Sequence, residues 1–294
     1  MFRYTYHTVD VFTDRRFGGN PLAVFPDATG LDPATMQALA AELNYSETTF
    51  VLRPENEANT ARVRIFNRTS EMAFAGHPNV GTAFVLARLG HVAGGRMSFE
   101  QPAGIVEVRL LVGEGAVCGA EIDAPQPLQV LGELPPSSIA DCLSIDAKHV
   151  VLAAHPPVRA TVGIEFVLVE VTMEALTRAA PDLIAYRRLA SSTNLGGRLS
   201  ILPYARLGDA GVRARMFAPL AGTWEDPATG SAHAALAALQ LSRSEPEALS
   251  YEAIQGVEMG RPSRLLLSAR RSGGAVRASV GGGCVSVFTG TIDL

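Results

Sequence analysis

The sequence predicts an α+β protein with two pseudo-symmetric lobes, each a barrel-like β-sheet around a central buried helix. The main observation is an internal repeat, because residues 62–83 resemble residues 213–232. Within this repeat His77 and Asp226 are 226 − 77 = 149 positions apart, and the same spacing relates a proline, a glycine and a hydroxyl residue. The chain of 294 residues is also long enough for two hydrophobic cores. An ancestral duplication therefore predicts both lobes.

Each copy of the repeat begins with a predicted strand and continues into a predicted helix. Arginine alternates with apolar residues over 62–66 and 213–217, which is the period of a strand with one buried face. Pro78 and Pro227 follow His77 and Asp226 directly. Because proline suits the first turn of a helix, both prolines predict helix starts.

The two helices of the repeat are expected to be buried on all sides. Val80–Leu89 and Ala232–Leu241 are apolar on nearly every face, which is typical of a helix that runs through the middle of a lobe. Gly90 predicts a C-terminal cap for the first of them. This arrangement, a β-sheet wrapped around a central helix, differs from a doubly wound layered fold.

Another helix and a strand are predicted from residue 32 onward. Asp32 is a typical N-cap, Pro33 suits the first turn, and apolar residues at helical spacing continue to about Asn44. The β-forming run 48–52 follows, so residues 45–47 form a helix-to-strand junction. Junctions of this kind often carry functional residues.

Glycine and proline indicate where the lobes divide. We expect an N-terminal lobe over 1–116 and a C-terminal lobe over 117–281, because glycines at 113–119 and prolines just beyond them interrupt the pattern. The residues 285–288 predict a strand after a loop at Gly281–Gly283. That strand is expected to return to the first lobe, completing it with 282–294.

Composition excludes several classes of function. The net charge of −4 provides no basic surface for nucleic acid, and the polar start of the sequence lacks the apolar run of a signal peptide, so we expect a cytoplasmic protein. The three cysteines are far apart and outside any metal-binding cluster. We interpret Cys118, Cys142 and Cys284 as buried free thiols.

The starts of the two repeated helices are candidate anion sites. Their first N–H groups have no partner within the helix, so they can hold a carboxylate. Gly230 and Ser231 suit this role, because glycine permits close approach and serine adds a donor, although plain helix capping is the alternative. Pseudo-symmetry would bring His77 and Asp226 to opposite sides of one cleft; taken singly, each is more often structural.

Glu47 is the candidate general acid/base, because it lies at the junction between the helix and the strand. An unperturbed glutamate titrates near pH ~4.3, so proton transfer at neutral pH needs a pKa raised by roughly 2–3 units through burial. His77 or Asp226 could serve as its partner.

With these residues in view, the sequence resembles the phenazine-biosynthesis PhzF-like family, which has the diaminopimelate epimerase fold. Six motifs in order carry the resemblance over nearly the whole chain: Val9–Phe12, Gly19–Val24, Asn44–Thr48, Phe74–Pro78, Glu225–Ala232 and Gln255–Ser263. The resemblance implies an isomerase that needs no cofactor or metal and moves a proton between carbons of a small unsaturated or amino-substituted carboxylic acid. It also implies a homodimer.

The resemblance assigns roles to individual residues. It implies that Glu47 is the general acid/base and that His77, Asp226 and Ser231 complete the catalytic group, with Ser46, Gly76 and Gly230 beside the substrate. Related epimerases and racemases use two cysteines, and neither helix start here contains one. A single carboxylate acting on one face is therefore favoured over two-thiol racemisation.

Some observations leave the substrate and the class open. Met72-Ala73 and Asn67-Arg68 depart from the usual family pattern beside the site, so phenazine synthesis is only one possible pathway. A protein that only binds small carboxylates is the main alternative, followed by a cofactor-independent epimerase or racemase. A metal hydrolase is disfavoured because no HxH or HExxH spacing occurs, and a nucleotide enzyme because no phosphate-loop motif does.

Overall fold

The computed structural model describes residues 2–91, 94–193, 195, 199–208 and 211–294. The chain forms two compact units. Unit 1 comprises Met1–Pro125 with Val280–Leu294, and unit 2 comprises Gln126–Ser279. In the described part of the chain, no helix is long and apolar enough to span a membrane.

Unit 1 is a closed β-barrel. Its described strands follow the order β1-β2-β3-β4-β6-β7-β8-β16, and β1 pairs with β16 to close the ring. Neighbours are parallel at β2–β3 and β4–β6. The elements are β1 (Arg3–Val11), β2 (Asn20–Phe25), α1 (Pro33–Leu43), β3 (Glu47–Leu52), β4 (Ala61–Asn67), β5 (Glu71–Met72), α2 (Gly76–Arg88), β6 (Arg96–Gln101), β7 (Gly104–Gly113), β8 (Ala116–Asp123) and β16 (Ala275–Asp293).

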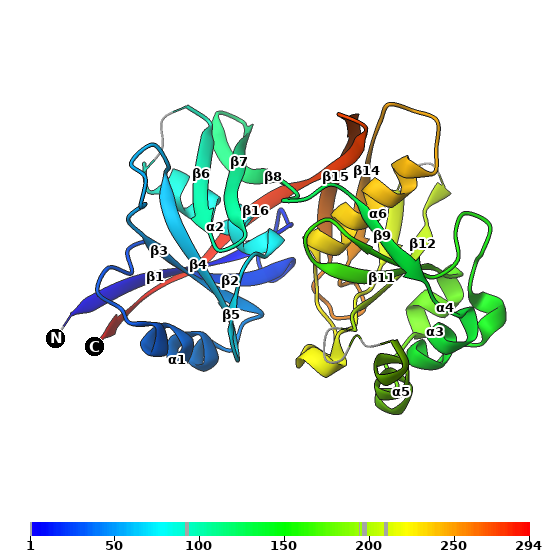
Figure 1. The fold of residues 1–294 in the computed structure, drawn as a ribbon. Helices are drawn as coiled ribbons and strands as arrows, with labels where there is room; N and C mark the ends of the chain where they lie inside the picture. Colours follow the sequence, from blue (N-terminus) through cyan, green and yellow to red (C-terminus); the bar gives the residue numbers. More distant parts are fainter. Residues whose placement is uncertain (1, 92–93, 194, 196–198, 209–210) are drawn as a thin grey trace. The chain divides into compact units, whose positions relative to one another are not determined.

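Helix α2 is the core of this barrel, as predicted. Every residue from Gly76 to Leu86 is buried, and the helix contacts β1, β2, β3, β7 and β8 (Figure 1). The cap at Gly90 is confirmed: its φ is 81°, its N–H donates to Ala87, and the next N–H donates to Leu86. These two bonds form a Schellman motif.

Helix α1 lies on the outside of the same barrel. The predicted cap is confirmed, because Asp32 accepts a hydrogen bond from the Thr35 N–H at 2.9 Å, and the helix ends at Asn44 in the left-handed conformation. Its apolar side packs on β3 and β4 through Met36 and an aromatic cluster that includes Phe50. This packing fixes the start of β3 directly after the helix.

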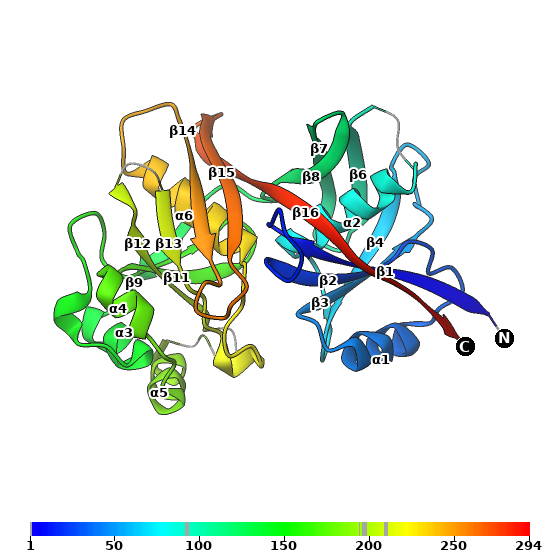
Figure 2. The same ribbon diagram turned by 180° about the vertical axis from the view of Figure 1, so that it is seen from behind.

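Unit 2 repeats the arrangement around helix α6. Its described strands follow the order β16-β15-β14-β13-β12-β11-β10-β9, with parallel pairs at β11–β12 and β13–β14. Figure 2 shows α6 behind β14 and β15, with α3, α4 and α5 outside the sheet. The elements are β9 (Gln129–Glu133), α3 (Pro136–Leu143), β10 (Val158–Thr161), β11 (Glu165–Glu170), α4 (Met173–Arg178), α5 (Leu183–Thr193), β12 (Ile201–Arg206), β13 (Gly211–Ala214), α6 (Gly230–Ser242), β14 (Ala248–Gln255) and β15 (Ser263–Ser272).

The predicted fold class is therefore confirmed, and the repeat is visible in the topology. In both units an antiparallel strand leads into the buried helix, and the next strand returns parallel to it: β4-α2-β6 and β13-α6-β14. Each unit buries the helix that the sequence marked as apolar on all faces.

The start of the second helix differs from the prediction. Helix α6 begins at Gly230, so Pro227 does not occupy its first turn, whereas Pro78 does lie in the first turn of α2. The Gln255 side chain bonds to the backbone of Asp226 and Thr229, and the Ser263 hydroxyl bonds to the carbonyl of Pro227. Because these groups take side-chain partners, the segment stays non-helical until Gly230.

Three further expectations need correction or revision. The glycines 281–283 form no loop but lie inside β16, where neighbouring atoms are close: a Cβ on Gly283 would lie 2.8 Å from the Thr13 oxygen. Strand β8 pairs with β7, so it belongs to unit 1, beyond the boundary expected at residue 116. Cys118 is exposed because it lies near the tip of the β7–β8 hairpin, whereas Cys142 and Cys284 are buried.

Candidate active site

The residues Glu47 and His77 lie together in unit 1. Glu47 is the first residue of β3, and its backbone is paired with β2 and β4. His77 is the second residue of α2. Its Nε2 lies 3.3 Å from Oε2 of Glu47, and the side chains are only 6% and 15% exposed, respectively. The expected acid/base is therefore in contact with His77, one of its two expected partners.

The His77 imidazole is neutral at physiological pH. Burial lowers the pKa of His77 to about 3, since a charged ring loses its hydration inside the barrel. A neutral imidazole can donate a proton at one nitrogen and accept at the other. The contact with Glu47 therefore places a neutral imidazole beside a carboxyl group.

Packing of α2 against the barrel sets this contact. Gly81 has no room for a side chain, because a Cβ there would lie 2.6 Å from Leu22 and 2.8 Å from Val11. Thr82 and Thr49 are both fully buried, and their hydroxyl oxygens are 2.8 Å apart. The glycine and the threonine pair hold the helix close to β3, which carries Glu47.

Helix α2 begins without a side-chain cap. The N-cap residue is Ala75, and no side chain caps the helix. Asn79, in the first turn, donates instead to the Ala75 carbonyl at 2.9 Å. Gly76 is buried at this start, and Ser46 is partly exposed immediately before Glu47. The uncapped start fits the predicted anion site.

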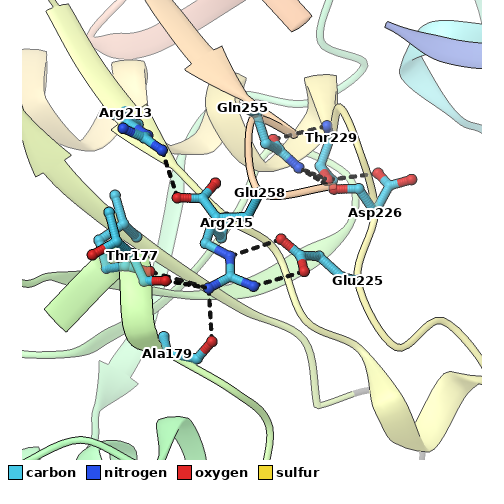
Figure 3. A network of polar contacts seen from close by, with 10 residues as sticks. Thr177, Ala179, Arg213, Arg215, Glu225, Asp226, Thr229, Gln255 and Glu258 are labelled. Carbon is cyan, nitrogen blue, oxygen red and sulfur yellow. Dashed lines mark hydrogen bonds and ion pairs between the residues drawn. The ribbon is translucent and has the colours of Figure 1, made fainter. Parts of the chain in front are cut away.

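Unit 2 contains the other predicted group, at the start of α6. Asp226 is 8% exposed, and its Oδ2 accepts a hydrogen bond of 2.6 Å from the Thr229 hydroxyl. Figure 3 shows Gln255 bound to both residues. The side chain of Thr229, the N-cap residue of α6, makes no cap bond to the helix, and in this respect the start of α6 at buried Gly230 and partly buried Ser231 resembles the start of α2.

The two units differ at the position of Glu47. In unit 1 Leu22 pairs with Glu47 at the β2–β3 step, and the corresponding parallel step of unit 2 pairs Val167 with Ile201. Unit 2 therefore has an apolar residue where unit 1 has the carboxylate. The Glu47 carboxylate has no counterpart at the matching position of unit 2.

Sequence reasoning missed the ion pair that anchors the Asp226 segment. The Arg215 guanidinium binds Glu225 through two nitrogens, at 2.7 and 2.8 Å, and donates to the Ala179 carbonyl at 2.7 Å (Figure 3). Arg215 was expected on the exposed face of a strand, but β13 ends at Ala214 and Arg215 is 8% exposed. The sequence contains one indication of this ion pair, the acidic residue Glu225 directly before Asp226.

A pocket of about 720 Å³ in unit 1 lies elsewhere. Its lining includes Arg62, Arg64 and Glu100, and neither Glu47 nor His77 is among the lining residues. The charged groups bind one another, as in the 2.6 Å contact between Arg64 and Glu71. This pocket is distinct from the predicted site.

Among the described residues no three His, Cys, Asp or Glu side chains are grouped to hold a metal ion.

Comparison with known proteins identifies the class of this chain. An uncharacterised isomerase of Mesorhizobium japonicum is 38% identical, with 98% of each chain covered. The trans-2,3-dihydro-3-hydroxyanthranilate isomerase of Pseudomonas fluorescens is 35% identical over 99% of this chain and 100% of its own length. These full-length relatives, both named as isomerases, place the chain in the isomerase class of enzymes.

The family follows from two further comparisons. The model of the phenazine biosynthesis-like proteins (PhzC-PhzF) matches residues 9–290, and the chain belongs to this family. A PhzF-family protein of Bacillus anthracis has the same fold, with a TM-score of 0.89 over the whole of both chains at 23% identity. The predicted family is confirmed.

Proposed function

We propose that this protein is a cofactor-independent isomerase that moves a proton between two carbons of a small unsaturated carboxylic acid. The observation that carries the proposal is the buried contact between Glu47 and the neutral ring of His77 at the start of α2. A carboxyl group in a poorly hydrated place can exchange protons near neutral pH, which an exposed glutamate does poorly.

The proposed reaction needs one base that later acts as an acid. The Glu47 carboxylate removes a proton from a saturated carbon, and the electron pair of that C–H bond forms a new C=C bond. The electron pair of the original C=C bond then takes the proton from the Glu47 carboxylic acid at the far carbon. Substrate and product are isomers, and no electron donor or acceptor is consumed.

The uncapped helix starts support recognition of a carboxylate. We propose that the N–H groups near Gly76 and Gly230 hold the substrate carboxylate and that Asp226 and Ser231 contact the same substrate. This requires the two helix starts to face one site, as the internal repeat predicts. Ser46, directly before Glu47, would line the same site.

The relatives suggest the substrate class. The Pseudomonas fluorescens relative is named for trans-2,3-dihydro-3-hydroxyanthranilate, a cyclic unsaturated acid with an amino group. We propose a substrate of this class for the present enzyme, with that compound as the first candidate.

The first experiment measures turnover of this compound and of related unsaturated carboxylic acids by proton NMR. We expect wild type to convert at least one of them to an isomer, and Glu47→Gln to lower kcat by about 10³-fold or more, because the amide cannot exchange the proton. Glu42→Gln is the matched control, since Glu42 is an exposed residue of α1.

Two outcomes would contradict the proposal. Binding of the acids without turnover would favour a carboxylate-binding protein, and an unchanged kcat in Glu47→Gln would exclude Glu47 as the acid/base. Inversion of one stereocentre without movement of the double bond would instead identify an epimerase.

A further inference from the structure

We propose that Phe17 is a specificity-determining residue of the candidate active site, whose aromatic ring packs against the unsaturated ring of a bound cyclic acid. The inference deepens the proposed function and rests on it for the nature of the substrate. Three observations within unit 1 carry it: the place of the β1–β2 loop (residues 12–19), the strained backbone at Phe17, and the hydrogen bonds that fix this backbone.

The β1–β2 loop lies at the end of the barrel that carries Glu47. Strand β2 is parallel to β3, and Leu22 pairs with Glu47, the first residue of β3. The residues before Leu22 therefore extend past the start of β3, and the β1–β2 loop directly precedes them. Helix α2 begins at the same end, since its second residue, His77, contacts Glu47. The loop, the carboxyl group and the imidazole thus share one end of unit 1.

Phe17 combines an exposed ring with an unfavourable backbone conformation. The residue is 65% exposed, and its φ is 68°. A bulky residue in this left-handed region is uncommon because its Cβ crowds the backbone, whereas glycine would occupy the position without that cost. An exposed ring gains little from packing that could offset the strain. Strain that is kept without such a gain is typical of functional sites.

Hydrogen bonds from the barrel hold the β1–β2 loop in this conformation. The N–H of Phe17 donates to Oδ2 of Asp10 at 2.7 Å, and Asp10 is buried in β1. The N–H of Thr13 donates to the Gly283 carbonyl at 3.1 Å, and the Arg16 side chain donates to another carbonyl of β16 at 3.0 Å. The loop is therefore preorganised, so a contact between its ring and a ligand costs little conformational entropy.

Two substitutions at Phe17 separate the ring from the backbone strain. Phe17→Gly removes the ring and suits the left-handed conformation, whereas Phe17→Tyr keeps an aromatic ring. With trans-2,3-dihydro-3-hydroxyanthranilate as substrate, we expect Phe17→Gly to raise KM by about 10-fold with kcat within about 2-fold of wild type, because the ring contact is made equally in the ground and transition states. Phe17→Tyr should keep KM within about 2-fold of wild type.

Binding is measured separately by calorimetry in the Glu47→Gln background, where no turnover consumes the acid. We expect Kd to rise as KM does when Phe17→Gly is added. Glu114→Gly is the matched control, since Glu114 also has a left-handed backbone, with a φ of 50°, but lies in the turn between β7 and β8. Both glycine variants should melt within about 2 °C of wild type or above it, because each loses backbone strain. Only Phe17→Gly should weaken binding.

Two results would overturn the role of Phe17. One is an unchanged Kd in Phe17→Gly. The other is a melting temperature of Phe17→Gly more than about 5 °C below that of wild type, because the ring would then serve packing within the protein.

Failure of the proposed function gives a different result. If wild type binds the cyclic acid without isomerising it, the isomerase activity fails, while the comparison of Kd values still decides the role of Phe17. If wild type isomerises acyclic unsaturated acids but binds no cyclic acid, the proposed activity stands and the inference on Phe17 fails.

Discussion

The substitution Glu225→Gln tests whether the buried ion pair anchors the segment that carries Asp226. The Arg215 and Glu225 side chains are only 9% and 11% exposed, so the pair is largely shielded from water. The substitution leaves the guanidinium buried without its counter-charge, a change that costs about 3–5 kcal/mol when a buried pair is broken. Arg215 keeps its contacts with carbonyl oxygens such as that of Ala179, so we expect the lower end, about 3 kcal/mol.

The assay for this prediction is urea unfolding followed by tryptophan fluorescence. Trp224 is the single tryptophan of the sequence and directly precedes Glu225, so its signal reports on unit 2. With a slope of about 1–3 kcal/mol per M urea, a loss of about 3 kcal/mol lowers the midpoint by about 1–3 M. Glu252→Gln is the control, because its ion pair with Arg264 is exposed and such pairs contribute about 0–1 kcal/mol.

Equal midpoints for Glu225→Gln and wild type would refute this reasoning. The reasoning would also be refuted if the exposed control lost as much stability as the buried variant, because burial would then have no influence on the free-energy cost of breaking the ion pair. If the reasoning holds, Glu225→Gln also lowers kcat, since the backbone of Asp226 is continuous with the anchored residue.

Two other predictions concern packing and pH. Gly81→Ala forces a Cβ against Leu22 and Val11, so we expect the free energy of unfolding in urea to fall by about 1–2 kcal/mol. We also expect a lower kcat, because α2 moves away from Glu47. Greater stability than wild type would contradict this prediction. The unfolded pKa of a histidine is near 6.5, whereas burial lowers the folded values of His77 and His233 to about 3 and 4. The unfolded chain therefore binds more protons below pH 6.5, and the free energy of unfolding should fall by about 2 kcal/mol per histidine between pH 7 and pH 5. Urea unfolding at both pH values tests this sign, and a stability that rises toward pH 5 would be inconsistent with neutral buried rings.

Local signals in the sequence predicted much of the fold. The cap at Asp32, the proline after it and the apolar spacing sufficed for α1, because each of these effects acts within one or two helical turns. The repeat and the uniformly apolar helices predicted two barrels, since a helix without a polar face has to be enclosed.

Long-range contacts explain what the sequence could not predict. Helix α6 begins at Gly230 because Gln255, 29 positions after Asp226, binds the backbone before the helix. The glycines 281–283 suggested a loop, yet they serve close backbone approach within a long strand. Of the candidate site, the sequence offered His77 and Asp226 as alternative partners of Glu47, and the structure shows the contact with His77. The hydrogen bond from Thr229 to Asp226 depends on donor and acceptor geometry that only the structure provides.

Carbon-bound deuterium uptake tests the central claim most directly. Wild type and Glu47→Gln are incubated in heavy water with trans-2,3-dihydro-3-hydroxyanthranilate, or with another acid that wild type converts. Deuterium at the carbons of product and recovered substrate is measured by NMR and mass spectrometry. If Glu47 is the acid/base that moves the proton, wild type incorporates solvent deuterium at carbon and the variant does not. Equal incorporation by both proteins would contradict the account.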